Sequence, residues 1–339
     1  MNGINRNGRL PRRAAKVIGV ALAGLLTVSS GARAQEALEL ISPDERNVVT
    51  VGVVDGALVY ALERDGRKVL LPSRLGFEFR GAPPLYEGLE ITGSERHATD
   101  QVWEQPWGEV ALVRDFHNEL RVSVAETGDP GRQFVVVFRA FDDGIAFRYE
   151  LPEQPGLGEF EIMDELTEFH LAEDPKTWWI PANDPTHRYE LLYRSSPAST
   201  IPEVHTPLTL ESLDGPVLVI HEANLVDYAG MNLTGSWERR LSVTLPAWAD
   251  GTKVRGRTPF LTPWRTIQMA DRAADLMPST LGLNLNPPNV LEDVSWIEPM
   301  KYVGIWWGMH INTVTWASGP DHGATTQNTT RMIDFAAQN

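Results

Sequence analysis

The stretch QFVVVFRAFDDGIAFRYEL (residues 133–151) decides the fold class of this chain of 339 residues. Apolar residues occupy every second position on both sides of its Asp-Asp-Gly turn: Phe138, Ala140, Ile145, Phe147 and Tyr149. A period of two is typical of β-strands, and an Asp-Gly turn flanked by such alternation predicts a hairpin. We therefore expect two antiparallel strands with one buried face and one polar face.

Short strands of the same kind are predicted along most of the chain. In residues 47–79, Asp-Gly pairs at 55–56 and 65–66 separate alternating apolar segments, which predicts a meander. Regular spacing of short strands is typical of a large β-sandwich. Three later stretches predict further strands: SLDGPVLVIHEANLV (212–226), RRLSVTLPAW (239–248) and STLGLNLN (279–286).

A different pattern begins near residue 296. The segment KYVGIWWGMHINTVTWASG (301–319) predicts a buried strand over Tyr302–Trp307 and a long polar loop, and TTQNTTRMIDFAAQN (325–339) predicts the start of an amphipathic helix. Strand, loop and helix in this order are how a βα unit begins in a parallel barrel or doubly wound sheet. Since one such unit cannot bury itself and Asn339 leaves the helix uncapped, we expect a truncated enzyme.

Residues 1–34 predict a secretory signal peptide. They carry six basic side chains and no acid, an apolar run at 17–28 that is too short to span a membrane as a mature helix, and small residues at Ala32 and Ala34. We place the cleavage after Ala34. No second hydrophobic span follows, so a periplasmic or secreted soluble protein is expected.

Charge and cysteine content exclude several classes of partner and site. Removing the six basic residues of the signal peptide changes the formal net charge from −15 to −21, which makes nucleic acid and anionic lipid poor partners. The chain has no cysteine, so no disulfide framework and no thiolate metal site can form. Its stability must come from the size of the core.

The segment WWIPANDPTHRYELLY (178–193) is the first of four clusters that can carry chemistry. Trp178 and Trp179 precede a turn-rich loop that ends at Glu190 between two tyrosines. Paired aromatic rings beside a carboxylate suit a sugar, because the apolar ring face stacks while hydroxyl groups seek acceptors. The alternative, an ordinary aromatic core with an exposed glutamate, stays open.

The segment VIHEANLVDYAGM (219–231) is the second cluster. His221, Glu222 and Asp227 are side chains that can ligate a metal, which would suit a metal-dependent β-sandwich enzyme. Alternation along a strand puts His221 and Glu222 on opposite faces, however, so they cannot both face one ion without a bulge. A structural role for this pair is therefore favoured.

Two tryptophan-containing segments complete the set. Trp264-Arg265 can supply a planar cation stacked on an indole, although an interdomain ion pair would have the same sequence. In GIWWGMH (304–310), Trp306 and His310 lie at the end of the expected first barrel strand, the position from which barrel enzymes present residues to substrate. One of the two adjacent tryptophans must point into packing.

Many segments of this chain resemble the N-terminal half of glycoside hydrolase family 97, over about residues 45–339. The resemblance is collinear and is carried by SRLGFEF, WGEVALVRDFHNEL, FRAFDDGIAFRYELPEQ, WWIPANDPTHRYELLY, VHTPLTLES, IHEANLVDYAGM, TPWRTI, LNLNPP, SWIEPMKYVGIWWGMH and MIDFAA. That family contains α-glucosidases and α-galactosidases built from an N-terminal β-super-sandwich, a (β/α)8 catalytic barrel and a small C-terminal β domain. The resemblance implies a mainly β chain: signal peptide 1–34, β-super-sandwich 35–295, and the truncated first βα unit of the barrel 296–339.

The resemblance implies roles for two residues. Glu190 matches the glutamate that the N-terminal domain lends to a Ca²⁺ ion near the reacting sugar, and Trp306 matches an aromatic residue of the sugar pocket. The catalytic carboxylates are expected beyond Asn339, so the chain alone should be inactive. The expected partners are an oligosaccharide or α-glycoside substrate and the remainder of the barrel.

The sequence leaves specificity, mechanism and one other function class open. It does not choose between glucoside and galactoside or between inversion and retention, since carboxylate separation decides the latter. A non-catalytic carbohydrate-binding β-sandwich module is the main alternative to a glycosidase.

Overall fold

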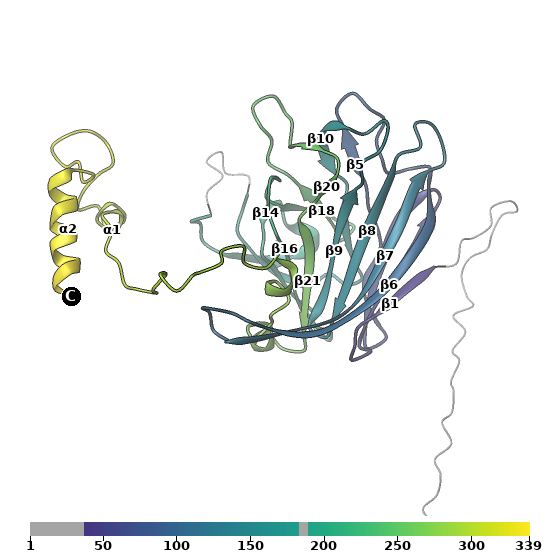
Figure 1. The fold of residues 1–339 in the computed structure, drawn as a ribbon, viewed down its shortest axis with the longest axis horizontal. Coiled ribbons are helices and arrows are strands. Elements are labelled where there is room, and N and C mark those ends of the chain that lie inside the picture. Colours follow the sequence, from purple (N-terminus) through teal and green to yellow (C-terminus); the bar gives the residue numbers. More distant parts are fainter. Residues whose placement is uncertain (1–36, 183–188) are drawn as a thin grey trace, which may run out of the picture. The chain divides into compact units, whose positions relative to one another are not determined.

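The computed structural model describes residues 37–182 and 189–339, and β-strands form most of its regular structure (Figure 1). The strands are β1 (Leu38–Ile41), β2 (Asn47–Val54), β3 (Ala57–Arg64), β4 (Arg67–Arg74), β5 (Phe77–Phe79), β6 (Leu89–Glu104), β7 (Leu112–Glu126), β8 (Gln133–Phe141), β9 (Gly144–Leu151), β10 (Glu159–Glu165), β11 (Glu168–Leu171), β12 (Lys176–Trp179), β13 (Arg194–Pro197), β14 (Glu203–His205), β15 (Leu208–Glu211), β16 (Val217–Ala223), β17 (Asn232–Gly235), β18 (Arg240–Thr244), β19 (Val254–Arg257), β20 (Phe260–Leu261) and β21 (Trp264–Ala270). The helices are the 3₁₀ turns η1 (Ala198–Thr200), η2 (Ala273–Leu276) and η3 (Leu283–Leu285), and α1 (Trp306–His310) and α2 (Thr326–Gln338).

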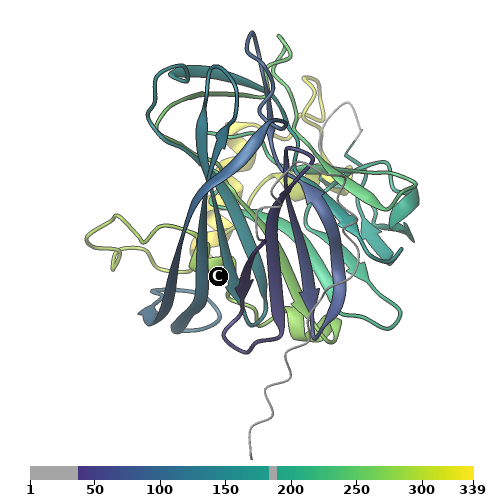
Figure 2. The ribbon, with the colours of Figure 1, turned by 90° about the vertical axis from the view of Figure 1, so that its right-hand side faces the viewer.

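The strands form antiparallel sheets, as the sequence predicts. One sheet has eight strands in the order β1-β2-β3-β4-β11-β18-β17-β14. A ten-stranded sheet has the order β13-β12-β15-β16-β21-β9-β8-β7-β6, with β20 paired to β9, and a three-stranded sheet has the order β19-β10-β5. Figure 2 shows the purple strands of the first sheet beside the blue strands of the second.

One hydrophobic core joins the two large sheets. The ring of Tyr60 on β3 packs on Phe138 of β8 and Phe147 of β9, with centroids 5.9 and 4.9 Å apart. All five alternating residues of the 133–151 hairpin are fully buried in this core. The predicted hairpin and its buried face are confirmed, because Phe141 pairs with Gly144 across the turn.

The predicted polar face of the same hairpin is wrong. A second, smaller core cluster covers it, made of Val137, Phe141, Ala146, Trp264, Leu281 and Leu285. The two arginines on this face lie over the Trp264 ring: the Arg139 and Arg148 guanidinium carbons are 4.7 and 4.6 Å from its centroid. Alternation showed which side chains share a face, but not that a later segment would cover the second face.

The predicted meander and two of the three further strands are confirmed. Both Asp-Gly pairs have positive φ at each residue, 50° and 78° at 55–56 and 52° and 73° at 65–66, as a two-residue hairpin turn of this type requires. The segments 212–226 and 239–248 contain β16 and β18. STLGLNLN is not a strand: it forms η3, and Leu281 and Leu285, four residues apart, pack on the second cluster.

The C-terminal segment agrees with the sequence only at its helix. Thr325 caps α2 by accepting a hydrogen bond from the Asn328 N–H, and the helix covers the range expected. The strand predicted over Tyr302–Trp307 is absent from this part of the structure, where Trp306–His310 is a five-residue helix instead. A barrel strand is stabilised by hydrogen bonds from neighbouring strands, and no described strand pairs with this segment.

The predicted signal peptide lies outside the described residues. Among the residues that are described, no helix is long and apolar enough to cross a membrane.

Candidate functional site

Strand β14 anchors both sides of the segment that leads to Glu190. On the near side, the His205 N–H donates to the Ile180 carbonyl at 2.9 Å, and the Ala182 N–H donates to the Glu203 carbonyl at 3.0 Å. On the far side, the Tyr189 ring stacks on the His205 ring, with centroids 4.5 Å apart and planes at 30°. Residues 183–188 lie outside the described residues. Glu190 therefore follows directly after a ring fixed to the sandwich.

Glu190 itself faces solvent. Its side chain is exposed, and within residues 37–182 and 189–339 its carboxylate has no hydrogen-bond or ion-pair partner. The next N–H, of Leu191, donates to the Tyr189 carbonyl at 2.8 Å and closes a tight turn around Glu190. Among the described residues, none occupies either carboxylate oxygen.

The Tyr189 side chain is 45% exposed. Burial raises the pKa of Tyr189 to about 12, and the nearby Tyr193 and the charge of Glu222 act in the same direction. The phenol therefore stays neutral at physiological pH. Its contact with His205 and its proximity to Glu222 connect the Glu190 segment to β16.

His221 and Glu222 have separate structural partners. The Glu222 carboxylate accepts hydrogen bonds from Arg265 Nη1 at 2.6 Å and from the Met231 N–H at 2.9 Å. The His221 Nδ1 lies 3.0 Å from the Thr206 hydroxyl, and burial lowers the pKa of this imidazole. Strand β16 pairs with β21 without a bulge, which leaves the two side chains on opposite faces. The structural role favoured for this pair therefore fits the contacts.

Arg265 is the centre of a buried ion-pair network. Its Nε and Nη2 donate to the two oxygens of Glu165 at 2.9 and 2.5 Å, and both side chains are fully buried. Burial opposes ionisation of Glu165, but the charge and hydrogen bonds of Arg265 outweigh it and lower the pKa of this carboxyl. The Tyr228 hydroxyl also donates to Glu165, at 2.7 Å.

Of the two alternatives left open for Trp264-Arg265, the stack of the guanidinium on the indole does not form. The Arg265 guanidinium lies 5.4 Å from the Tyr228 ring centroid, on the opposite side of β21 from the second core cluster that holds Trp264. Successive residues of a strand point to opposite faces, so adjacent residues cannot stack on each other. The ion pair that Arg265 makes is within the sandwich.

The other aromatic candidates divide between core and surface. Trp179 is buried, and its indole N–H donates to Ser196 at 3.1 Å, whereas Trp178 is 40% exposed with the Lys176 ammonium 3.9 Å from its ring centroid. Trp306 is 55% exposed and lies 5.1 Å from the His310 ring.

Sequence reasoning missed Glu165 and His205. Alternation from Phe160 and Ile162 would place Asp164 in the core, but the register of β10 shifts between Ile162 and Asp164 and turns Glu165 inward. His205 carried no signal, because its contact with Tyr189 joins positions that are distant in strand order. No group of three His, Asp or Glu side chains able to hold a metal occurs among the described residues.

The family model described as glycosyl-hydrolase 97 N-terminal matches residues 40–288. The chain belongs to glycoside hydrolase family 97. A solved family 97 enzyme from Pseudoalteromonas sp. strain K8, in complex with acarbose, is 44% identical with a TM-score of 0.81, and the match covers 89% of this chain and 46% of that one. A variant family 97 enzyme from that strain, in complex with panose, has the same identity, coverage and TM-score.

Two curated relatives agree with this assignment. A probable retaining alpha-galactosidase of Streptomyces bingchenggensis is 28% identical, over 96% of this chain and 48% of the relative. A retaining alpha-galactosidase of Bacteroides thetaiotaomicron is 25% identical, over 91% of this chain and 49% of the relative. The family 97 chain therefore spans about half the length of the curated relatives it matches.

Proposed function

We propose that this chain is the N-terminal part of a calcium-dependent, exo-acting α-glycosidase that removes terminal α-linked glucose or galactose. The observation that carries the proposal is Glu190: a carboxylate without a described partner, on a segment anchored to the sandwich, in a family 97 chain. The family assignment supports a glycosidase, and the relatives support the α-glycoside class.

Glu190 fits one position in a calcium site and no more. Ca²⁺ takes six to eight oxygen ligands in flexible geometry, and an exposed carboxylate without a partner among the described residues suits it. The described residues contain no group of three candidate ligands, and we propose that the other ligands come from the part of the enzyme that this chain does not span. When bound, the ion would supply positive charge beside the sugar. Glu190 would also tie the sandwich to the catalytic domain.

Trp306 is proposed to line the sugar pocket. Its exposed indole offers a flat apolar surface, and His310 beside it offers a ring nitrogen for a sugar hydroxyl. The catalytic acid and its partner carboxylate are proposed to lie in the remaining barrel, since hydrolysis needs two carboxyl groups flanking the bond. We further propose export to the periplasm or medium, on the strength of residues 1–34.

The test is hydrolysis of p-nitrophenyl α-glucoside and α-galactoside by the complete gene product, with and without chelator. We expect one of the two to be cleaved, activity to be lost with chelator, and Ca²⁺ to restore it. Absence of hydrolysis, together with saturable oligosaccharide binding, would support the carbohydrate-binding module instead. Hydrolysis that is indifferent to chelator would contradict the calcium requirement.

A further inference from the structure

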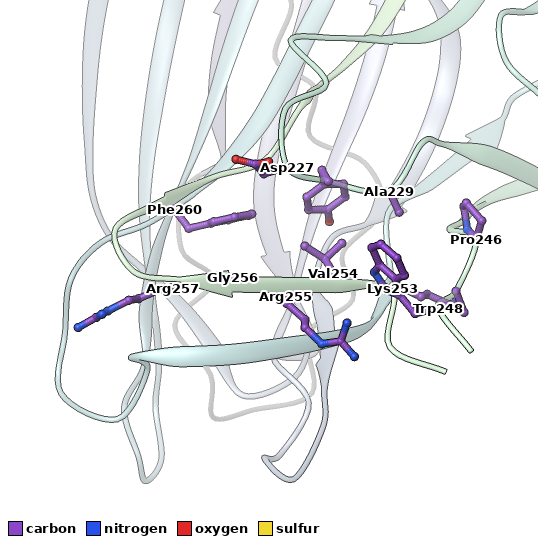
Figure 3. A pocket seen from close by; sticks show the side chains of 12 residues that line it. Asp227, Ala229, Pro246, Trp248, Lys253, Val254, Arg255, Gly256, Arg257 and Phe260 are labelled. Atoms are coloured by element: carbon purple, nitrogen blue, oxygen red, sulfur yellow. The ribbon is translucent and has the colours of Figure 1, made fainter. Parts of the chain in front are cut away.

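A groove of about 730 Å³ lies beside β19 and the loops that follow β16 and β18 (Figure 3). We call it the Trp248 groove and define it by Asp227, Tyr228, Trp248, Arg255, Arg257 and Phe260. Its volume is within the range of roughly 300–1,000 Å³ typical of small-molecule sites. Neither Glu190 nor Trp306 contributes to it.

The wall of the groove is apolar and fixed. Phe260 packs edge-on against Phe160, with ring centroids 5.3 Å apart and planes at 90°, and lies 6.2 Å from the Tyr228 ring. This packing requires glycine at position 256, because a Cβ there would lie 2.4 Å from the Phe160 ring and 3.1 Å from the Phe260 ring. An aromatic wall beside polar side chains is the composition of a sugar site.

The Trp248 side chain is exposed to solvent and extends from a turn that is closed by backbone hydrogen bonds. Trp248 is 64% exposed, whereas its backbone N–H donates to the Thr252 carbonyl at 2.8 Å and its backbone carbonyl accepts from the Gly251 N–H at 2.9 Å. Arg80 also stabilises this turn, because its guanidinium donates to the Asp250 carbonyl and the Thr252 hydroxyl. A ligand stacking on this ring would lose little free energy to ordering the backbone of the turn.

Charge pairing around the groove indicates the charge of the ligand. Lys253 pairs with Asp164 at 2.7 Å, and Arg255 pairs with Asp250 and Glu161. An anionic ligand would have to compete with these carboxylates, whereas hydroxyl groups can use the remaining N–H donors and carboxylate lone pairs. Asp227 and Arg257, both exposed, add an acceptor and a donor at the rim.

We propose that the Trp248 groove binds a neutral oligosaccharide at a site separate from Glu190. One pyranose ring stacks on the Trp248 indole, and further units extend toward Asp227 and Arg257. The Arg255 guanidinium, 5.9 Å from the indole centroid, donates to hydroxyl groups beside the stacked ring. Such a site would keep a polymeric or oligomeric sugar on the sandwich.

Isothermal titration of the 339-residue chain with maltotriose and raffinose tests this site. At least one of these neutral trisaccharides is expected to bind, and Trp248→Ala is expected to weaken it roughly tenfold or more, about 1.4 kcal/mol per tenfold. Trp248→Phe should restore part of the affinity. Trp237→Ala is the matched control, since Trp237 is 81% exposed and is not part of the groove.

Besides the Glu190 control described below, three results would overturn the proposal. They are absence of binding by both sugars, unchanged affinity in Trp248→Ala with an unchanged unfolding midpoint, and preference for an anionic trigalacturonate over both neutral sugars. A Glu190→Ala variant should bind as the wild type does. Loss of binding in that variant would place the sugar beside Glu190 and not at the Trp248 groove.

Discussion

Tyr189 links the surroundings of Glu190 to those of Glu222. Its ring stacks on His205, and the charge of Glu222 raises its pKa. Glu222 is occupied on both oxygens by Arg265 and the Met231 N–H. Glu190 is exposed, with both oxygens free of described partners. The difference separates a carboxylate held by partners within the sandwich from an exposed carboxylate that has no partner among the described residues.

The largest effect is expected from removing the centre of the buried network. Arg265→Met leaves Glu165 and Glu222 as uncompensated charges, so the free energy of unfolding should fall by about 3–5 kcal/mol in urea denaturation. Arg272→Met is the control, because the Arg272–Asp275 pair is exposed, and it should leave the midpoint unchanged. An unchanged midpoint in Arg265→Met would show that the network does not stabilise the sandwich.

The second prediction concerns the anchor of the Glu190 segment and rests on the proposed calcium site. Tyr189→Ala removes the stack on His205 and should weaken Ca²⁺ binding by the complete gene product roughly tenfold, as loss of an orienting partner does. Tyr189→Phe keeps the ring and should keep the affinity. Equal affinity in the alanine variant would mean that Glu190 does not depend on this anchor.

The sequence predicts those features of the fold whose contacts join residues close together along the chain. Alternation and Asp-Gly turns were sufficient for the 133–151 hairpin and the meander, because those contacts are local. The same patterns could not predict the burial of Glu165, which a register shift turns inward. Nor could they predict that Leu281 and Leu285 cover the second face of the hairpin. The prediction of a strand at Tyr302–Trp307 was wrong, because no described strand pairs with this segment. The site roles of Glu190 and Trp306 remain predictions.

A third, smaller effect is expected from His221. Burial lowers its folded-state pKa, so below about pH 6.5 the unfolded chain binds a proton that the folded protein does not. Because the unfolded state then binds more protons, stability should fall as the pH is lowered through this range. His221→Gln should flatten the pH dependence of the urea midpoint between pH 7 and 5. His97→Gln, at an exposed position, should not; if it flattens the curve equally, His221 is not the group responsible.

The smallest effect on stability is expected at Glu190. Since its side chain is exposed and has no described partner, Glu190→Ala should change the free energy of unfolding by no more than about 0.5 kcal/mol. Urea denaturation of Glu190→Ala and of Arg265→Met under the same conditions compares the two losses of stability directly. A loss comparable to that of the arginine variant would mean that Glu190 has a structural role.

Calorimetric titration of Ca²⁺ into the complete gene product, wild type and Glu190→Ala, tests the central claim most directly. We expect stoichiometric binding by the wild type and strongly weakened binding by the variant, with an unchanged unfolding midpoint in calcium-free buffer. Unchanged calcium affinity in Glu190→Ala would contradict the role proposed for this residue.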